Sequence, residues 1–355
     1  MIESRGGACS VSTEKNYKLM KKEALFYEKN SDGTVKCNLC PHHCSIKPNC
    51  CGVCRVRKNI DGILYSTSYG LTCSVRFDPV EKKPLYHYYP GKEILSVGGF
   101  GCNLHCVFCQ NYHISQIDDL ESTVCDTITP AELAKLYKKE RNSCGFSFTY
   151  NEPTVNYEFI YETAKEACLQ QIPVALVTNG FINQEPLKKL LPYVNALNVD
   201  VKSFSDEFYR KQTGGRLLPV LETIKTAKAQ NKHIEITFLA INGLNDSPSE
   251  LNNIVNWIAE NVGKDTPFHI SRYFPNYKLK TAPTPKNVLI QLYEIASKRL
   301  DFIYLGNVSD SEYLKTKCPS CHTVLVERNG YHSKVTGLTD RGTCVKCGYS
   351  ANFVL

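Results

Sequence analysis

From about residue 94 onward, the chain alternates short apolar runs with longer segments whose apolar positions recur at helical spacing. The apolar runs predict strands at 94–99, 145–150, 174–178, 196–201, 233–241, 268–273 and 302–305. The segments between them predict helices near 130–142, 154–170, 184–191, 218–230, 248–262 and 286–299. Each helix must cover the face that its strand exposes, so six such units predict a parallel sheet curled into a partial (β/α)6 barrel of the TIM type. The expected fold class is α/β.

Cysteine-rich segments flank this series on both sides. We therefore expect four regions: an N-terminal extension at 1–35, a Cys-rich metal-binding subdomain at 36–92, the partial barrel at 93–310 and a zinc ribbon at 314–355. Within the extension, the charged segment 17–29 is compatible with one helix.

The composition argues against several classes of protein. The chain has 355 residues, of which 42% are hydrophobic, enough for a sizeable core. No apolar run approaches the ~18 residues of a membrane span, and the first residues lack the apolar stretch of a signal peptide. We therefore expect a cytoplasmic protein with no membrane partner. The net charge of +7 is spread among both signs without a basic block, so we do not expect nucleic-acid binding.

The 18 cysteines are clustered, which points to metal ligands in a long chain without a signal sequence. The central cluster directly follows the first strand and consists of Cys102, Cys106 and Cys109 in a C-x3-C-x2-C pattern. Three thiolates in one loop can hold three irons of a [4Fe-4S] cluster and leave the fourth iron open to a small molecule. Zinc loops usually pair two C-x2-C elements, so a zinc loop or inert thiols are the weaker interpretation.

The first cysteine cluster allows two ligand sets. One set forms two C-x2-C knuckles from Cys37, Cys40, Cys51 and Cys54. The other replaces Cys51 by Cys44 and forms a C-x2-C-x3-C element with a later fourth cysteine. Either set suits zinc, and the second also suits an auxiliary iron-sulfur cluster. Uncoordinated cysteines are the third alternative, because further thiols and two histidines crowd the loop.

The last cluster is simpler. Cys318 and Cys321 form one C-x2-C element, and after 22 residues Cys344 and Cys347 form another. Two knuckles across a hairpin-forming sequence predict a zinc ribbon with four thiolates and no open position. Such a site supports folding rather than catalysis.

Polar residues follow the predicted strands, at the edge where ligands bind in barrels of this type. They include Asn151 and Glu152 after the second strand and Asn307 after the last. Asn, Gly and Asp after strands are also ordinary turn formers. Asp200 and Lys202 at the end of the fourth strand are harder to dismiss, because buried charges need partners and a zwitterionic, ribose-bearing cofactor would supply one. The stretch 78–91, just before the barrel, suits a substrate-facing rim or a packed connector.

Several motifs, in one order, resemble a known family: "CNLCPHHC", "EKKPLYHYYPG", "GCNLHCVFCQNYHIS", "FTYNEPT", "VTNGF", "NVDVK", "GLNDSP", "SRYFPNYKL" and "LGNV". Together they resemble the radical S-adenosylmethionine (SAM) protein of the AmmeMemoRadiSam system, which is similar to the pyruvate formate-lyase activating enzymes. The resemblance spans about residues 36–308 and includes the paired knuckles of the tail.

The resemblance implies a role for each candidate residue. Cys102, Cys106 and Cys109 would ligate the [4Fe-4S] cluster that cleaves SAM. Asn151 and Glu152 would lie near the SAM amino group, Asp200 and Lys202 near its methionine and ribose, and Asn307 near its adenine. The early cysteine pattern of the family favours Cys37, Cys40, Cys44 and Cys54 as one site, and this sequence departs from it by adding Cys50 and Cys51.

The resemblance also implies an activity. Reductive cleavage of SAM would give methionine and a 5'-deoxyadenosyl radical that abstracts hydrogen from a protein or peptide substrate, as in glycyl-radical activases. An alternative is radical-based modification of a residue on a Memo-like partner. The implied partners are a Memo-like protein, an AMMECR-domain protein and a reductant such as flavodoxin or ferredoxin. A metal-stapled protein or nucleic-acid binding module is a rival of another class, but it would not explain the central cysteine trio.

Overall fold

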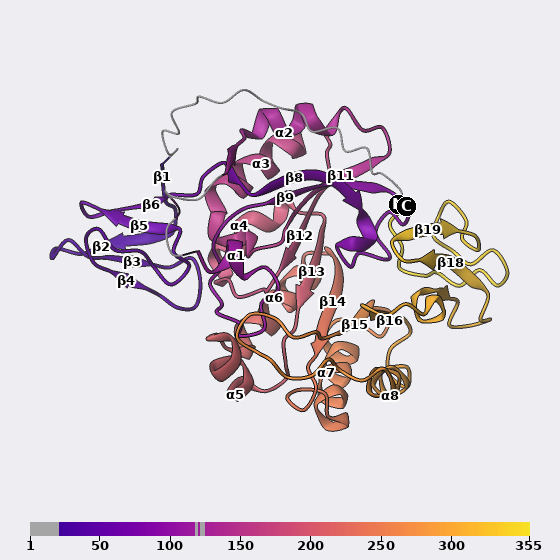
Figure 1. Ribbon diagram of the computed structural model, residues 1–355. Coiled ribbons are helices and arrows are strands. Elements are labelled where there is room, and N and C mark those ends of the chain that lie inside the picture. Colours follow the sequence, from indigo (N-terminus) through magenta and orange to yellow (C-terminus); the bar gives the residue numbers. More distant parts are fainter. Residues whose placement is uncertain (1–20, 118–119, 121–124) are drawn as a thin grey trace, which may run out of the picture.

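The computed structural model describes residues 21–117, 120 and 125–355 (Figure 1). Its centre is an eight-stranded sheet in the order β16-β15-β14-β13-β12-β11-β9-β8. Seven strands run parallel, and β8 lies antiparallel to β9 at one edge. The strands are β8 (Ser74–Pro79), β9 (Glu93–Gly98), β11 (Ser143–Thr149), β12 (Val174–Thr178), β13 (Ala196–Asp200), β14 (His233–Ala240), β15 (Phe268–Arg272) and β16 (Ile303–Gly306).

Helices connect the parallel strands, and local sequence signals fix where several of them begin. Thr129 and Glu132 form a reciprocal capping box at the start of α2, and Ser247 caps α7 through the backbone N–H of Glu250. Pro130 and Pro248 occupy the first helical positions, where no backbone N–H is needed. The helices are α1 (Tyr112–Ser115), α2 (Pro130–Tyr137), α3 (Tyr157–Leu169), α4 (Gln184–Leu190), α5 (Asp206–Phe208), α6 (Leu217–Ala229), α7 (Pro248–Asn261) and α8 (Lys286–Ala296).

The α/β class and the parallel sheet expected from the apolar pattern are confirmed. Each of the seven predicted strands is present, and β12 has the predicted limits. The described part of segment 17–29 is not a helix, however. Lys22–Glu23 forms β1, which pairs with β6, and Tyr27–Lys29 forms β2, which pairs with β3. Pairing to neighbouring strands here overrides the local preference for helix.

The N-terminal segment packs beside the core sheet as two small antiparallel sheets, in the orders β1-β6-β5 and β2-β3-β4. These strands are β3 (Val35–Cys37), β4 (Ser45–Ile46), β5 (Arg57–Ile60) and β6 (Ile63–Ser66), in addition to β1 and β2. A buried ion pair of 2.9 Å between Arg57 and Glu158 joins this segment to α3. The short strands β7 (Leu71–Thr72) and β10 (Asp126–Thr127) pair with each other nearby.

The C-terminal segment forms a three-stranded antiparallel sheet of β17 (Thr316–Lys317), β18 (Val324–Asn329) and β19 (His332–Val335). It has a small core of its own, which includes Tyr86 and Tyr304 from the main body. Figure 1 shows the N-terminal sheets (indigo) and this C-terminal sheet (yellow) on opposite sides of the central sheet. Among the described residues, no helix is both long and apolar enough to cross a membrane.

Candidate functional site

The central cysteines lie on the loop that follows β9. Cys106 is buried, and Cys102 and Cys109 are half-buried. The backbone N–H of Leu104 donates to Cys102 Sγ over 3.3 Å, and Ser115 Oγ lies 3.1 Å from Cys109 Sγ. Burial raises the pKa of the Cys106 thiol to about 12, so its thiolate needs a cationic partner such as a metal. The loop therefore fits the ligation of an iron-sulfur cluster.

The three cysteines open onto a cavity of about 670 Å³. It lies at the carboxyl ends of the parallel strands, where the sequence placed the candidate residues. Its lining includes all eight candidates for cluster and SAM binding: Cys102, Cys106, Cys109, Asn151, Glu152, Asp200, Lys202 and Asn307. The fold thus brings together residues that are spread over about two hundred positions of the chain.

Asn151 and Glu152 are engaged mainly in positioning the loops around this cavity. The Asn151 amide donates to the carbonyl oxygens of Phe100 and Gly101 over 3.0 Å, and its Oδ1 accepts from Gly99 N. Asn151 thereby fixes the start of the cysteine loop. Glu152 Oε1 accepts from Thr154 and Thr178, and its Oε2 accepts from the Asn179 backbone N–H over 2.7 Å. Burial raises the pKa of the Glu152 carboxyl.

Asp200 and Lys202 pair with each other across 2.8 Å. The sequence analysis gave a cofactor as the partner of these charges, but in the structure Asp200 and Lys202 are also partners of each other. Burial works against the charge on Lys202, but Asp200 and the Cys106 thiolate raise the pKa of its ammonium above the ordinary value. The structure therefore holds a fixed cation beside one of the three cysteines.

Asn307 also lines the cavity, and its backbone lies in the left-handed region at φ 59°. Its amide donates to the carbonyl oxygen of Arg272 over 3.0 Å. The cavity is also lined by Thr237 of β14 and by His269 and Ser271 of β15.

The rim contains residues that the sequence did not assign to the site. Gly330 and Tyr331, at the turn between β18 and β19, line the same cavity. Nothing in the local sequence of that hairpin indicates proximity to the central cysteines, because only the tertiary packing of the C-terminal sheet creates it. Glu81, Lys82 and Tyr86 line the cavity as well, so part of stretch 78–91 is a rim rather than a connector alone.

A buried carboxylate holds this rim in place. Glu235 of β14 is fully buried and accepts from the backbone N–H groups of Tyr86 and His87 over 2.9 and 2.7 Å. Its two oxygens also lie 3.0 and 2.7 Å from ring nitrogens of His233 and His269. Although burial opposes ionisation, these two histidines hold the pKa of Glu235 below its usual range. The rim is thus fastened to the sheet by hydrogen bonds to a charged acceptor.

Comparison with known proteins gives the family of this chain. The family described as the radical SAM superfamily matches residues 96–258. The chain is 40% identical over 337 residues to uncharacterized protein MJ0808 of Methanocaldococcus jannaschii, across 94% of this chain and all of that protein. This chain belongs to the radical SAM superfamily. The superfamily implies a [4Fe-4S] cluster and SAM, and the lining of the cavity fits both.

The radical SAM domain is homologous to glycyl-radical activating enzymes. The 4-hydroxyphenylacetate decarboxylase activating enzyme of Clostridium scatologenes is 27% identical over 139 residues, which are 38% of this chain and 45% of that enzyme. Among solved structures, Streptococcus suis SuiB bound to S-adenosylmethionine is similar at a TM-score of 0.47 and 15% identity, over 58% of this chain and 48% of that chain.

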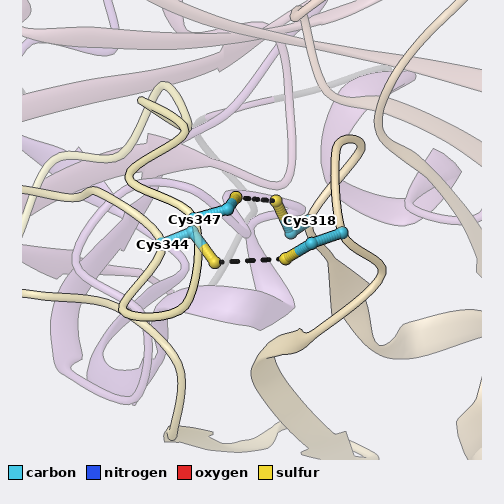
Figure 2. Close-up of side chains that lie close together, drawn as sticks. Cys318, Cys344 and Cys347 are labelled. Carbon is cyan, nitrogen blue, oxygen red and sulfur yellow. Dashed lines mark hydrogen bonds between the residues drawn. The ribbon is translucent and has the colours of Figure 1, made fainter.

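The four C-terminal cysteines form a compact site apart from the radical SAM loop. Cys318 Sγ lies 3.5 Å from Cys347 Sγ, and Cys321 Sγ lies 3.6 Å from Cys344 Sγ (Figure 2). All four sulfur atoms lie within 4.8 Å of one another. A tetrahedral zinc ion with bonds of about 2.3 Å places its thiolates about 3.8 Å apart. The four residues therefore fit the zinc predicted from their spacing.

The N-terminal cysteine segment lies next to the radical SAM loop. Cys37 and Cys54 are buried, Cys40 and Cys44 are half-buried, and Cys50 and Cys51 are exposed. A side chain at Gly101, which has φ +83°, would stand 2.7 Å from the carbonyl oxygen of Cys54. Glycine at this position therefore lets the two cysteine-bearing segments touch.

Proposed function

We propose that this protein is a radical SAM enzyme that abstracts hydrogen from a protein or peptide substrate, in the manner of a glycyl-radical activase. One observation carries the proposal: Cys102, Cys106 and Cys109 share a single cavity with the Asp200–Lys202 pair and with polar ends of several strands. The activity of the relatives named as activating enzymes supports the choice of substrate class.

In this proposal Cys102, Cys106 and Cys109 hold a [4Fe-4S] cluster. When bound, the cluster supplies one electron to the sulfonium of SAM, which releases methionine and a 5'-deoxyadenosyl radical that takes a hydrogen atom from the substrate. The chain supplies the orientation. Lys202 and Asp200 offer fixed opposite charges to the ribose and methionine ends, and Asn307 offers polar contacts to adenine.

The strands and their helices would form the partial (β/α)6 barrel, and four thiolates would hold zinc in the C-terminal ribbon. The rim formed by 81–86 and Tyr331 stands where a substrate chain would enter. A tyrosine such as Tyr331 on this rim suits a peptide, because its side chain offers both apolar area and a hydrogen-bonding hydroxyl.

We also propose that the protein acts in an AmmeMemoRadiSam system, in the cytoplasm, with Memo-like and AMMECR-domain proteins as partners and flavodoxin or ferredoxin as reductant. The ordered motifs support this assignment. The reaction on such a partner has two possible products, which two measurements separate. A glycyl radical gives a persistent paramagnetic signal on the partner, whereas a modification gives a mass shift.

The test is SAM cleavage by the anaerobically reconstituted protein with dithionite. We expect 5'-deoxyadenosine from the wild type and none above background from Cys106→Ala, which also loses the four irons of this loop. Cys168→Ala is the matched control, because Cys168 is exposed at the end of α3. Cleavage retained by Cys106→Ala, or a wild type that is inert with its irons in place, would contradict the proposal.

A further inference from the structure

The radical SAM loop comes close to the surface of the protein between Cys106 and Cys109. The carbonyl oxygen of Val107 accepts from the backbone N–H groups of Lys278 and Leu279, over 3.0 and 2.9 Å. Lys278 is exposed, and Val107 directly follows Cys106 in the chain. One hydrogen bond therefore connects an exposed residue with the neighbour of a cysteine of the radical SAM loop.

Other sides of this loop are occupied. The N-terminal segment contacts it at Gly101, beside the carbonyl oxygen of Cys54, and at Asn103, whose carbonyl oxygen lies 2.7 Å from the His42 ring nitrogen. The three cysteines line the cavity, which in the proposed function holds SAM and the substrate. The exposed segment at Val107 offers another protein an approach that neither of these takes up.

The segment that binds Val107 presents aromatic rings with cations beside them. Phe274 is 41% exposed, and the half-buried Tyr277 stacks on Tyr112 of α1 with 4.5 Å between ring centres. Lys278 and Lys280 are exposed, and neither forms an ion pair with a carboxylate of the residues that the structure describes. Aromatic rings bordered by polar side chains are typical of protein–protein interfaces. We call segment 274–280 together with Tyr112 the 274–280 face.

Hydrogen bonds hold the 274–280 face in one shape. Tyr277 has its backbone in the left-handed region, at φ 50°, which is uncommon for an aromatic residue. Asn276 Oδ1 accepts from the Tyr277 backbone N–H over 2.8 Å, and the Asn276 amide donates to the carbonyl oxygen of Gln110 over 3.4 Å. The Tyr273 hydroxyl donates to the carbonyl oxygen of Leu279 over 2.9 Å. A face that is already ordered loses little entropy when a partner binds.

The charge of this face is positive. The neighbouring segment 210–212 also binds Val107, through the Gln212 carbonyl oxygen, but its two cations are each paired over 2.6 Å with a carboxylate of α5. The charge without a partner within the described part of the chain therefore comes from Lys278 and Lys280. The net charge of +7 acts in the same direction at longer range. Such a face fits an acidic partner.

We propose that the 274–280 face docks an acidic one-electron carrier protein, which delivers the electron for SAM cleavage from the side of Val107. The inference rests on the proposed function, for which it names the surface that meets the reductant. The carrier is oxidised by one electron, which passes to the site of Cys102, Cys106 and Cys109 and is used in breaking the S–C5' bond of SAM. Electron-transfer partners bind through small, transient interfaces, so a face of this size is sufficient.

The first test measures binding, by calorimetric titration of the anaerobically reconstituted full chain with oxidised flavodoxin. The wild type should bind, and its Kd should rise with salt because the charges are screened. Lys278→Glu/Lys280→Glu should weaken binding by about tenfold or more, whereas Lys278→Arg/Lys280→Arg should bind as the wild type does.

Lys138→Glu/Lys139→Glu is the matched control for the binding test. Both lysines are exposed and follow α2, which packs on α3, and the double substitution changes the net charge by the same amount. We expect it to bind as the wild type does. Equal weakening by the two charge reversals would show that only net charge matters and would overturn the inference, as would a wild type that does not bind.

The second test compares two electron donors in SAM cleavage by the same variants. With reduced flavodoxin below saturation, Lys278→Glu/Lys280→Glu should form 5'-deoxyadenosine more slowly by about tenfold or more. Dithionite is small and needs no docking face, so with dithionite the variant should match the wild type. An equal loss with both donors would mean that the substitutions damage the loop itself, which would overturn the docking role.

The inference and the proposed function can fail separately. A wild type that dithionite drives, but that neither flavodoxin nor ferredoxin drives, would overturn the docking face and leave the proposed function supported. A wild type that is inert with dithionite while its irons are in place would contradict the proposed function itself.

Discussion

The N-terminal and C-terminal cysteine sites each offer four thiols, yet the chain builds them differently. In the ribbon, Cys318 and Cys344 are buried between two knuckles, and all four sulfur atoms fall within 4.8 Å. In the N-terminal site the thiols come from β3, a turn and the segment before β5, and they are not drawn to that spacing. The ribbon has the geometry of a site for a single ion, whereas the N-terminal thiols are not gathered to that spacing in the described part of the chain.

The two sites also differ in the parts of the molecule that they contact. On the N-terminal side, the His42 ring nitrogen lies 2.7 Å from the carbonyl oxygen of Asn103 in the radical SAM loop. The ribbon instead packs on the main body through aromatic rings, with His87 stacked on Phe353 at 3.9 Å between ring centres. It meets the cavity at Tyr331, on the hairpin turn. Spacing and contacts together separate a segment that touches the radical SAM loop from one that forms part of the cavity wall.

The largest loss of stability is expected when one of the four thiolates of the ribbon is removed. Cys344→Ser should lose the zinc, because three thiolates at this spacing leave one tetrahedral position without its ligand. The metal supplies most of the folding energy of such a small sheet, so the ribbon should lose more than about 5 kcal/mol of stability. Zinc content and limited proteolysis of the C-terminal segment measure the effect. Cys168→Ser is the control, and an intact ribbon without zinc would contradict the prediction.

The second largest loss of stability is expected from Glu158→Gln, which affects the N-terminal segment. The substitution leaves the Arg57 guanidinium buried without its carboxylate, which costs about 3–5 kcal/mol when one partner of a buried pair is removed. We expect the N-terminal sheets to loosen and the zinc of the ribbon to stay. Chemical denaturation with metal analysis tests both parts. Glu166→Gln, at a half-buried position of the same helix, is the matched control. Loss of zinc in Glu158→Gln would contradict the distinction between the two sites.

The sequence predicts the strands and the cysteine loop well, because the signals for both are local. Apolar runs place the strands within one or two residues of their observed limits, and the C-x3-C-x2-C spacing places the trio on the loop after β9. Two results needed the tertiary structure. Spacing alone could not distinguish Cys44 from Cys51, whereas in the structure Cys44 is half-buried and Cys51 is exposed. Tyr331 could not be placed at the cavity either, because it lies more than two hundred positions from Cys109 in the chain.

The interface that holds the ribbon should be sensitive to acid. Burial lowers the pKa of His87 to about 3, and Arg328 and His233 oppose its protonation while Glu235 favours it. The unfolded chain takes up this proton near pH 6.5 and the folded chain does not, so stability falls as pH drops from 6.5 toward 3. The loss is about 2 kcal/mol at pH 5.

Urea unfolding at pH 7 and pH 5 measures this loss. His87→Gln is the informative variant, because an amide can contact Asn352 and Tyr304 as the imidazole does and has no proton to gain. Zinc thiolates also bind protons in acid, but they do so in both proteins. The difference in pH dependence between wild type and His87→Gln therefore isolates the histidine, and identical profiles would contradict its role.

The smallest effect should come from Arg328→Lys, which separates docking of the ribbon from its folding. The Arg328 guanidinium donates to the carbonyl oxygens of Leu314 and Tyr86 over 3.0 and 2.6 Å and to Thr316 over 2.7 Å. It also lies over the Tyr86 ring at 4.4 Å. A lysine ammonium cannot reproduce this fork, so we expect a loss of about 1.5 kcal/mol.

Zinc should remain bound in Arg328→Lys, because the four cysteines of the ribbon are unchanged. Hydrogen exchange should therefore quicken at the contact between β18 and the 81–86 rim, with the knuckles still protected. Arg341→Lys is the matched control, since Arg341 is exposed on the same ribbon. Loss of zinc from Arg328→Lys would mean that docking and metal binding form one cooperative unit, and the ribbon would then be no more independent of the main body than the N-terminal site is.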